Sequence, residues 1–195
     1  MPHSFTVTFD YRCPFAYNGN AAVVRALQDG ADHDVRFAVF SLDQNHVADG
    51  DTPVWERPAD QRGSGVLALL FGIAVRDHFA ERFLDTHLEL FAARHDRNEQ
   101  VRDEAVLRRA VARAGCDPDA VAEAAHLPET LATLAREHTE MVSEHQVFGV
   151  PTFVAHGHAT FIRFMERGNV ADLERALDLL AWSNLNEFKR TTVPF

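Results

Sequence analysis

A cysteine followed by a proline, between a strand pattern and a helix pattern, constrains this chain more than any other feature. Residues 5–9 (FTVTF) alternate apolar and polar side chains, as a half-buried strand does. Cys13 and Pro14 follow, before a segment rich in Ala, Val and Leu that runs to Gln28. Because proline is favoured at the first position of a helix, Pro14 should begin the helix and Cys13 should lie at or beside its N-cap.

That position predicts a reactive thiol. The unpaired N–H groups and the positive end of the helix dipole would point at the sulfur of Cys13, and both favour a thiolate, so a lowered pKa is expected. The alternative is that Cys13 is a small buried apolar residue, because free cysteines are often buried. The turn alone does not separate these two interpretations.

A second motif lies late in the chain. Val147 to Val154 (VFGVPTFV) places Pro151 at the start of a β-rich run, just after a long helical segment. A proline cannot donate to a strand ladder, so Pro151 belongs at a strand start or an edge. A cis Val150–Pro151 bond is compatible with this position.

Together, the two motifs resemble the thioredoxin superfamily. The long helical stretch between them is similar to its DsbA-like branch, which also contains the 2-hydroxychromene-2-carboxylate isomerases and the kappa-class glutathione transferases. The resemblance covers essentially the whole chain and implies an α/β, thioredoxin-like fold with a large helical insertion. The implied thioredoxin-like domain is formed by residues 1–62 and 147–195, and the inserted helical subdomain by residues 63–146.

The chain departs from this branch at the motif itself. Redox members carry Cys-x-x-Cys, whereas here Ala16 stands in place of the second cysteine. The isomerases and kappa-class transferases carry serine where Cys13 stands, so neither group matches fully. A mixed disulfide between Cys13 and a small thiol or a partner protein remains open, because exchange needs only one attacking thiolate.

The periodicity predicts the remaining elements. We expect a second strand parallel to the first, a loop, a helical region, a hairpin around His156-Gly157-His158 and a closing helix capped by Asn169. The predicted ranges are 35–40 for the second strand, 41–62 for the loop, 65–146 for the helical region, 152–155 and 159–164 for the hairpin strands, and 170–182 for the closing helix.

Composition excludes some functions. The chain has 195 residues and a net charge of −10, which argues against nucleic acid or an anionic membrane as a partner. It shows neither a secretion signal nor about 18 uninterrupted apolar residues, so a cytoplasmic location is expected. Cys13 and Cys116 do not form a disulfide framework. Cys116 is followed by an acidic residue, which disfavours a thiolate, and is interpreted as structural.

Other candidate residues each have a structural alternative. Asn45 and Trp55 lie in a loop that leaves the carboxyl end of the second strand, where ligands of α/β proteins gather, although a solvated connector with Trp55 packed on the helices is favoured. His138 and His145 interrupt an apolar helix stripe and could assist Cys13, but hydrogen-bonded structural histidines are favoured. Arg163 could hold a carboxylate, but an outward-facing strand position is favoured.

A metal site is not expected. His138, Glu144, His145, His156 and His158 fall close together in sequence, but they do not show the spacing of a known metal motif.

The preferred hypothesis is a thiol–disulfide oxidoreductase that uses the single cysteine Cys13. The resemblance implies that Pro151 shapes the cleft wall and that the Val150 backbone pairs with a peptide or a thiol tripeptide. The other predicted wall or substrate-binding residues are Pro14, Phe15, Ala16, Tyr17, Asn45, Trp55 and His145, with Phe15 and Tyr17 on an apolar rim. No tightly bound cofactor is expected. A small thiol of the glutathione or mycothiol type would resolve the mixed disulfide.

Two alternatives remain. One is a thiol-dependent isomerase or transferase, in which Cys13 only orients the bound thiol. The other is a non-catalytic binding module that lost its redox function with the second cysteine. A homodimer is also possible, with the tail to Phe195 docked on the partner.

Overall fold

The computed structural model describes residues 2–184 and contains one four-stranded sheet. The strands are β1 (Ser4–Phe9), β2 (Asp34–Val39), β3 (Thr152–Ala155) and β4 (His158–Phe161), in the order β2-β1-β3-β4. β2 runs parallel to β1, which confirms the predicted βαβ unit. β3 is antiparallel to both β1 and β4.

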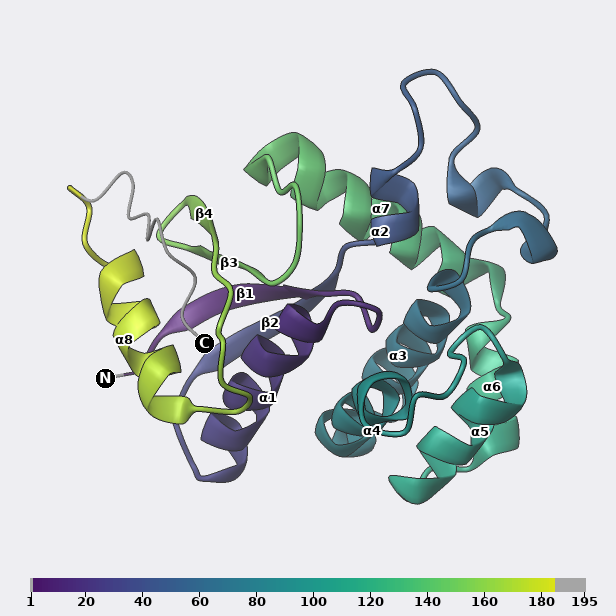
Figure 1. Ribbon diagram of the computed structural model, residues 1–195, viewed down its shortest axis with the longest axis horizontal. Coiled ribbons are helices and arrows are strands. Elements are labelled where there is room, and N and C mark those ends of the chain that lie inside the picture. Colours follow the sequence, from purple (N-terminus) through teal and green to yellow (C-terminus); the bar gives the residue numbers. More distant parts are fainter. Residues whose placement is uncertain (1, 185–195) are drawn as a thin grey trace.

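Most helices lie between β2 and β3 in the sequence. These are α2 (Leu42–Asn45), α3 (Val66–His78), α4 (Phe83–His95), α5 (Glu104–Arg113), α6 (Pro118–Ala125) and α7 (Pro128–His145), whereas α1 (Pro14–Gln28) lies between β1 and β2, and α8 (Val170–Leu180) follows β4. Figure 1 shows α3 to α6 grouped to one side of the sheet, and α7 returning the chain towards β3. The predicted α/β fold with a helical insertion is therefore confirmed.

Side-chain caps explain where several helices begin. The Cys13 sulfur accepts a hydrogen bond from the first turn of α1, and Pro14 is the first residue of that helix, as predicted. The carboxylate of Asp117 caps α6, and the amide of Asn169 caps α8. The β3–β4 hairpin turns at His156 and Gly157, whose φ angles of 53° and 80° are those of a tight hairpin turn.

The second strand is shifted by one residue and the closing helix ends two residues early, at Leu180. Two other predicted ranges differ more. The segment 41–62 contains α2 and two short 3₁₀ helices, Val54–Glu56 and Ala59–Gln61, because Ser41 caps the first and prolines precede the other two. The second hairpin strand ends at Phe161 instead of residue 164. Arg163 therefore does not occupy a strand position.

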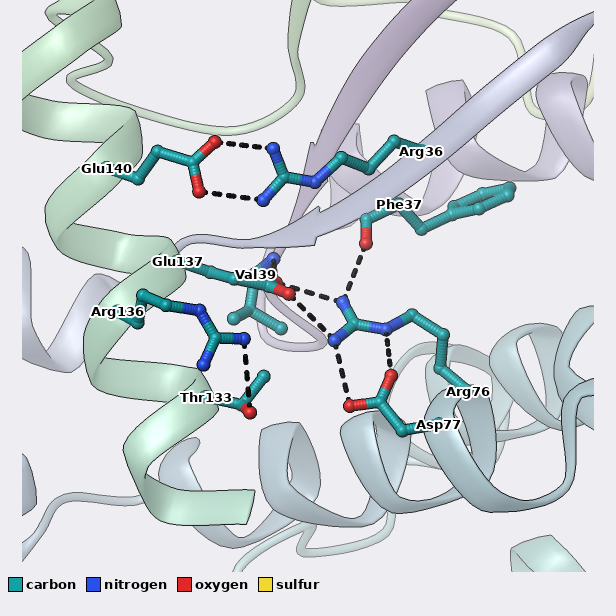
Figure 2. Close-up of polar contacts among 9 residues, drawn as sticks. All are labelled: Arg36, Phe37, Val39, Arg76, Asp77, Thr133, Arg136, Glu137 and Glu140. Carbon is teal, nitrogen blue, oxygen red and sulfur yellow. Dashed lines mark hydrogen bonds and ion pairs between the residues drawn. The ribbon is translucent and has the colours of Figure 1, made fainter. Parts of the chain in front are cut away.

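Buried charges join the helical insertion to the sheet. Arg76 on α3 donates hydrogen bonds to the Glu137 carboxylate of α7 and to the Phe37 carbonyl of β2 (Figure 2). Glu137 also accepts from the Val39 N–H at 3.0 Å. Both charged side chains are largely shielded from solvent, so this cluster fixes α3 and α7 against the end of β2.

The division into a thioredoxin-like domain and an inserted subdomain stays a prediction, because such contacts cross the proposed boundary. In the part of the chain that the structure describes, none of the helices has the length and apolarity needed to cross a membrane. The expectation about the C-terminal tail concerns residues that lie outside the described range.

Candidate active site

Cys13 lies where the end of β1 meets the loop before β3. Its half-buried sulfur accepts a hydrogen bond from the Ala16 N–H at 3.4 Å, and its S–H donates to the Val150 carbonyl at 3.3 Å. The Val150–Pro151 peptide bond is cis. Residues 137 positions apart thus form the two sides of one site, and each of the two predicted motifs contributes one side.

The pKa of the Cys13 thiol is raised, contrary to the prediction. Burial is the largest cause, and the negative charge of Asp10 acts in the same direction. The N–H groups of Ala16 and Phe15 and the positive charge of Arg163 lower the pKa, but by less. The predicted helix N-terminus is present, but the removal of the sulfur from water outweighs it.

A buried carboxylate shapes the turn that carries Cys13. Asp10 is fully buried and accepts hydrogen bonds from the N–H groups of Arg12 and Leu42, both at 2.8 Å. Arg12 in turn pairs with Asp43 at 2.9 Å. Burial raises the pKa of Asp10, whereas the charge of Arg12 and the two N–H donors lower it. These contacts attach the start of the segment 41–62 to the Cys13 turn.

The sequence analysis missed this role of Asp10. A usable signal was present, since an aspartate two residues before a turn residue commonly accepts the N–H of that residue. The link to Leu42 is a tertiary contact that no local pattern indicates.

A buried chain of hydrogen bonds from α4 and α1 also supports the turn that carries Cys13. Tyr11 bonds to Nδ1 of His87 at 2.9 Å, and Nε2 of His87 bonds to Oδ1 of Asn20 at 3.0 Å. The Asn20 amide group donates to the Thr8 and Ala16 carbonyls, so Oδ1 is the acceptor and His87 carries its proton on Nε2. Burial lowers the pKa of His87 to about 3, so the ring is neutral and links α4 to α1.

The sequence of residues 6–178 matches the DSBA-like thioredoxin domain. The chain belongs to this family. Its two cysteines, Cys13 and Cys116, are both free, and Ala16 is the third residue after Cys13.

Solved structures share the DSBA-like fold. A Pseudomonas aeruginosa DsbA variant is 18% identical, with a TM-score of 0.61 over 91% of this chain and 84% of that one. The oxidoreductase NmDsbA1 from N. meningitidis is 15% identical, with a TM-score of 0.62 over 91% and 82%. A 2-hydroxychromene-2-carboxylate isomerase is 15% identical, with a TM-score of 0.66 over 91% and 95%. No curated protein is a significant match to the sequence.

The residues predicted to line the site lie in different environments. Phe15 is half-buried and lies under the guanidinium of Arg163, whose Cζ is 5.2 Å from the ring centre. Pro14 is exposed and Ala16 is fully buried. The prediction that Tyr17 lines the rim is wrong, because its ring is buried against Phe91 in a parallel stack at 5.1 Å.

An aromatic pair that the sequence analysis did not select lies beside Val150. Phe148 is 67% exposed, and its ring centre is 5.2 Å from that of Phe161. An exposed phenylalanine two residues before Val150 adds apolar surface to this side of the site. Sequence alone gave no signal of its exposure, because the surrounding run is uniformly apolar.

The structure does not bring the other predicted residues to Cys13. Asn45 is exposed at the end of α2. Trp55 lies 5.7 Å from the His138 ring, which supports the alternative that it packs on the helices. His138 accepts from the Ser41 N–H at 3.1 Å, and burial lowers its pKa to about 4, so its role is structural. His145 lines a surface hollow with Ser4 and Arg36, at the opposite end of β1.

The second cysteine is buried, and three possible metal-ligating residues lie close together on α7. Cys116 is buried, and its sulfur lies 3.5 Å from the Thr86 hydroxyl. Glu140, Glu144 and His145 bring possible metal-ligating atoms within 4.8 Å of one another. The Glu140 carboxylate accepts hydrogen bonds from both outer nitrogens of Arg36. The expectation that the chain has no metal site stays a prediction.

Proposed function

We propose that this protein catalyses thiol–disulfide exchange through the single cysteine Cys13, together with a small thiol of the glutathione or mycothiol type. One observation carries the proposal: the Cys13 sulfur lies 3.4 Å from the Ala16 N–H and 3.3 Å from the Val150 carbonyl. A small thiol or peptide bound along Val150 would place its sulfur beside Cys13. Exchange with a pool of reduced small thiol fits the cytoplasmic location expected from the sequence.

The exchange proceeds in two balanced steps. The Cys13 thiolate attacks the R sulfur of a mixed disulfide R–S–S–R′, in which R–S is the small-thiol half and R′–S is the substrate, so that Cys13–S–S–R forms and the substrate leaves as the thiolate R′–S⁻. A second small thiolate then attacks the R sulfur, which releases the Cys13 thiolate and forms a small-molecule disulfide. The protein returns to its starting state, and the electrons that reduce the substrate come from the small thiols.

The raised pKa of Cys13 affects both steps. Fewer molecules carry a thiolate at neutral pH, although each thiolate is the stronger nucleophile. A thiolate with a raised pKa is also a poorer leaving group than an ordinary cysteine thiolate, so Cys13 should be released slowly from the mixed disulfide. Because a strong oxidant needs a stabilised thiolate, we propose that Cys13 works in the reducing direction and does not introduce disulfides.

Intact-mass measurement after incubation with oxidised glutathione, and separately with oxidised mycothiol, tests the proposal. The wild type and the Cys116→Ser variant should each gain one small-thiol adduct, which reductant removes, and Cys13→Ser should gain none. Cys116→Ser is a matched control because its sulfur is buried beside Thr86. An adduct confined to Cys116, or none on the wild type, would overturn the proposal.

A second candidate function is thiol-dependent isomerisation. The protonated Cys13 sulfur donates to the Val150 carbonyl, and a serine hydroxyl at this position could donate in the same way. The isomerases and kappa-class transferases carry serine there. Chemistry that needs only a hydrogen-bond donor should survive Cys13→Ser, whereas thiol–disulfide exchange should be lost.

A further inference from the structure

An arginine, Arg163, lies beside the proposed nucleophile. Arg163 follows the end of β4 and is exposed. Its guanidinium lies over the ring of Phe15, two residues after Cys13. The N–H of the preceding residue, Ile162, donates to the Pro151 carbonyl at 3.2 Å, which fixes this segment to the other side of the site.

Two other arginines near this site, Arg167 and Arg12, form ion pairs with acidic residues. Arg167 also lies over an aromatic ring, with its Cζ 3.9 Å from the centre of Tyr17, but it pairs with Asp96 at 2.6 Å. Arg12, next to Cys13, pairs with Asp43. Among residues 2–184, Arg163 makes no ion pair and no side-chain hydrogen bond with another described residue.

This arrangement suits the recognition of an anion. Stacking on Phe15 restricts the guanidinium without using its N–H donors, which stay available to a carboxylate. The chain as a whole carries a net charge of −10, so a cation that has no acidic partner among residues 2–184 differs from its surroundings. Guanidinium and carboxylate groups can pair through two parallel hydrogen bonds, which adds orientation to attraction.

We propose that Arg163 is a specificity-determining residue that selects thiols and disulfides carrying a carboxylate near the reacting sulfur. The inference rests on the proposed exchange at Cys13 and deepens it. Arg163 would hold the carboxylate while the Cys13 thiolate attacks the adjacent sulfur and the other half of the disulfide leaves as a thiolate. Between the two proposed small thiols, this favours one of the glutathione type, which carries carboxylates.

Two disulfide reagents of different charge test the proposal. Dithiobis-nitrobenzoate carries a carboxylate on each half, and dithiodipyridine carries none. Both react with thiolates by the same exchange, so the ratio of their rates cancels any change in the Cys13 thiolate fraction. The Cys116→Ser background leaves Cys13 as the reacting thiol.

Arg163→Gln should lower the rate ratio of the anionic to the neutral reagent by about two- to fivefold, as expected for an exposed ion pair. Added salt should lower the ratio for the parent protein and leave that of Arg163→Gln nearly unchanged. Arg163→Lys should retain much of the preference. Arg167→Gln is the matched control and should leave the ratio unchanged, because its charge is already paired with Asp96.

The outcomes distinguish a failure of the Arg163 proposal from a failure of the proposed exchange at Cys13. If Cys13 reacts with both reagents but Arg163→Gln keeps the parent ratio, the role of Arg163 is overturned while exchange at Cys13 stands. If Arg167→Gln lowers the ratio as much as Arg163→Gln, general surface charge explains the preference and the proposal also fails. If Cys13 reacts with neither reagent, the proposed function fails as well.

Discussion

At the scale of the residue, two opposing effects act on the Cys13 sulfur. The first turn of α1 supplies N–H donors that favour a thiolate, whereas burial and the charge of Asp10 favour the thiol. The sulfur also donates to the Val150 carbonyl, a bond that only the protonated form can make. The result is a protonated nucleophile held in place at neutral pH, which becomes reactive as the pH rises.

The pH dependence of alkylation at Cys13 measures this balance. In the Cys116→Ser variant, we expect an apparent pKa above the ordinary cysteine value of about 8.5, because desolvation outweighs the helix N-terminus. The same variant unfolded in denaturant provides the ordinary value for comparison. An apparent pKa below that of the unfolded chain would mean that the helix N-terminus is the stronger effect.

At this scale, the sequence predicts the position of a residue in its helix better than it predicts the burial of the side chain. It placed Cys13 at the N-cap and Pro14 at the first helical position, because these positions follow from backbone geometry within a few residues. It leaves the burial of Cys13 open as an alternative, because that burial depends on segments more than a hundred residues away. Tyr17 was misplaced for the same reason, because its stacking partner Phe91 belongs to α4.

At the scale of the elements, the Arg76–Glu137 cluster connects α3, α7 and β2 (Figure 2). A buried ion pair contributes less to stability than its hydrogen bonds suggest, because both charges lose their hydration. Removing one partner is costly, because the other is left buried and unpaired. Here the loss would also leave the Val39 N–H without its acceptor.

The variant Glu137→Ala should therefore lower the free energy of unfolding by about 3–5 kcal/mol. Glu140→Ala, one turn along the same helix, removes the partner of Arg36 in a more exposed pair and should cost less than about 1 kcal/mol. Denaturant unfolding of both variants measures the contrast. Equal losses would show that the burial of the Arg76–Glu137 pair has no special effect on stability.

Sequence patterns predict that the hairpin exists but not where its second strand ends. The hairpin was predicted because a His-Gly-His turn flanked by β-rich runs is a local signal. The predicted strand extended to residue 164 because the run from Phe161 is apolar, but the ladder ends at Phe161 and the chain then turns towards Phe15. That early end brings Arg163 to the site.

At the scale of the whole molecule, the fold is built so that two distant motifs meet. β1 pairs with β2 on one side and with β3 on the other, so the turn after β1 faces the loop before β3. The helical insertion occupies the chain between β2 and β3 (Figure 1). It supports the Cys13 turn through hydrogen bonds of His87 to Tyr11 and Asn20. The resemblance predicted this architecture, since two short motifs at this separation are uncommon outside the family.

Buried neutral histidines should make the stability of the whole molecule depend on pH. In the unfolded chain, His138 titrates near pH 6.5, whereas in the fold its pKa is about 4. The folded state disfavours protonation, so the contribution of His138 is complete above pH 6.5 and is lost as the pH falls towards 4. This loss amounts to about 3 kcal/mol.

A variant isolates this contribution. In His138→Asn, the amide oxygen takes the place of Nδ1 as the acceptor for the Ser41 N–H, but it does not titrate. The free energy of unfolding of this variant should fall less steeply between pH 6.5 and 4 than that of the wild type. Denaturant unfolding across that range measures the difference, and parallel slopes would contradict the assignment. His87 remains in both proteins and contributes equally to each.

The most direct test of the central claim is turnover at Cys13. We would measure the reduction of hydroxyethyl disulfide by glutathione, and in parallel by mycothiol, with the wild type, Cys13→Ser and Cys116→Ser. The account predicts that the wild type and Cys116→Ser turn over with at least one of the two thiols, at a rate that rises with pH, and that Cys13→Ser is inactive. Activity that survives in Cys13→Ser, or its absence from the wild type with both thiols, would contradict the account.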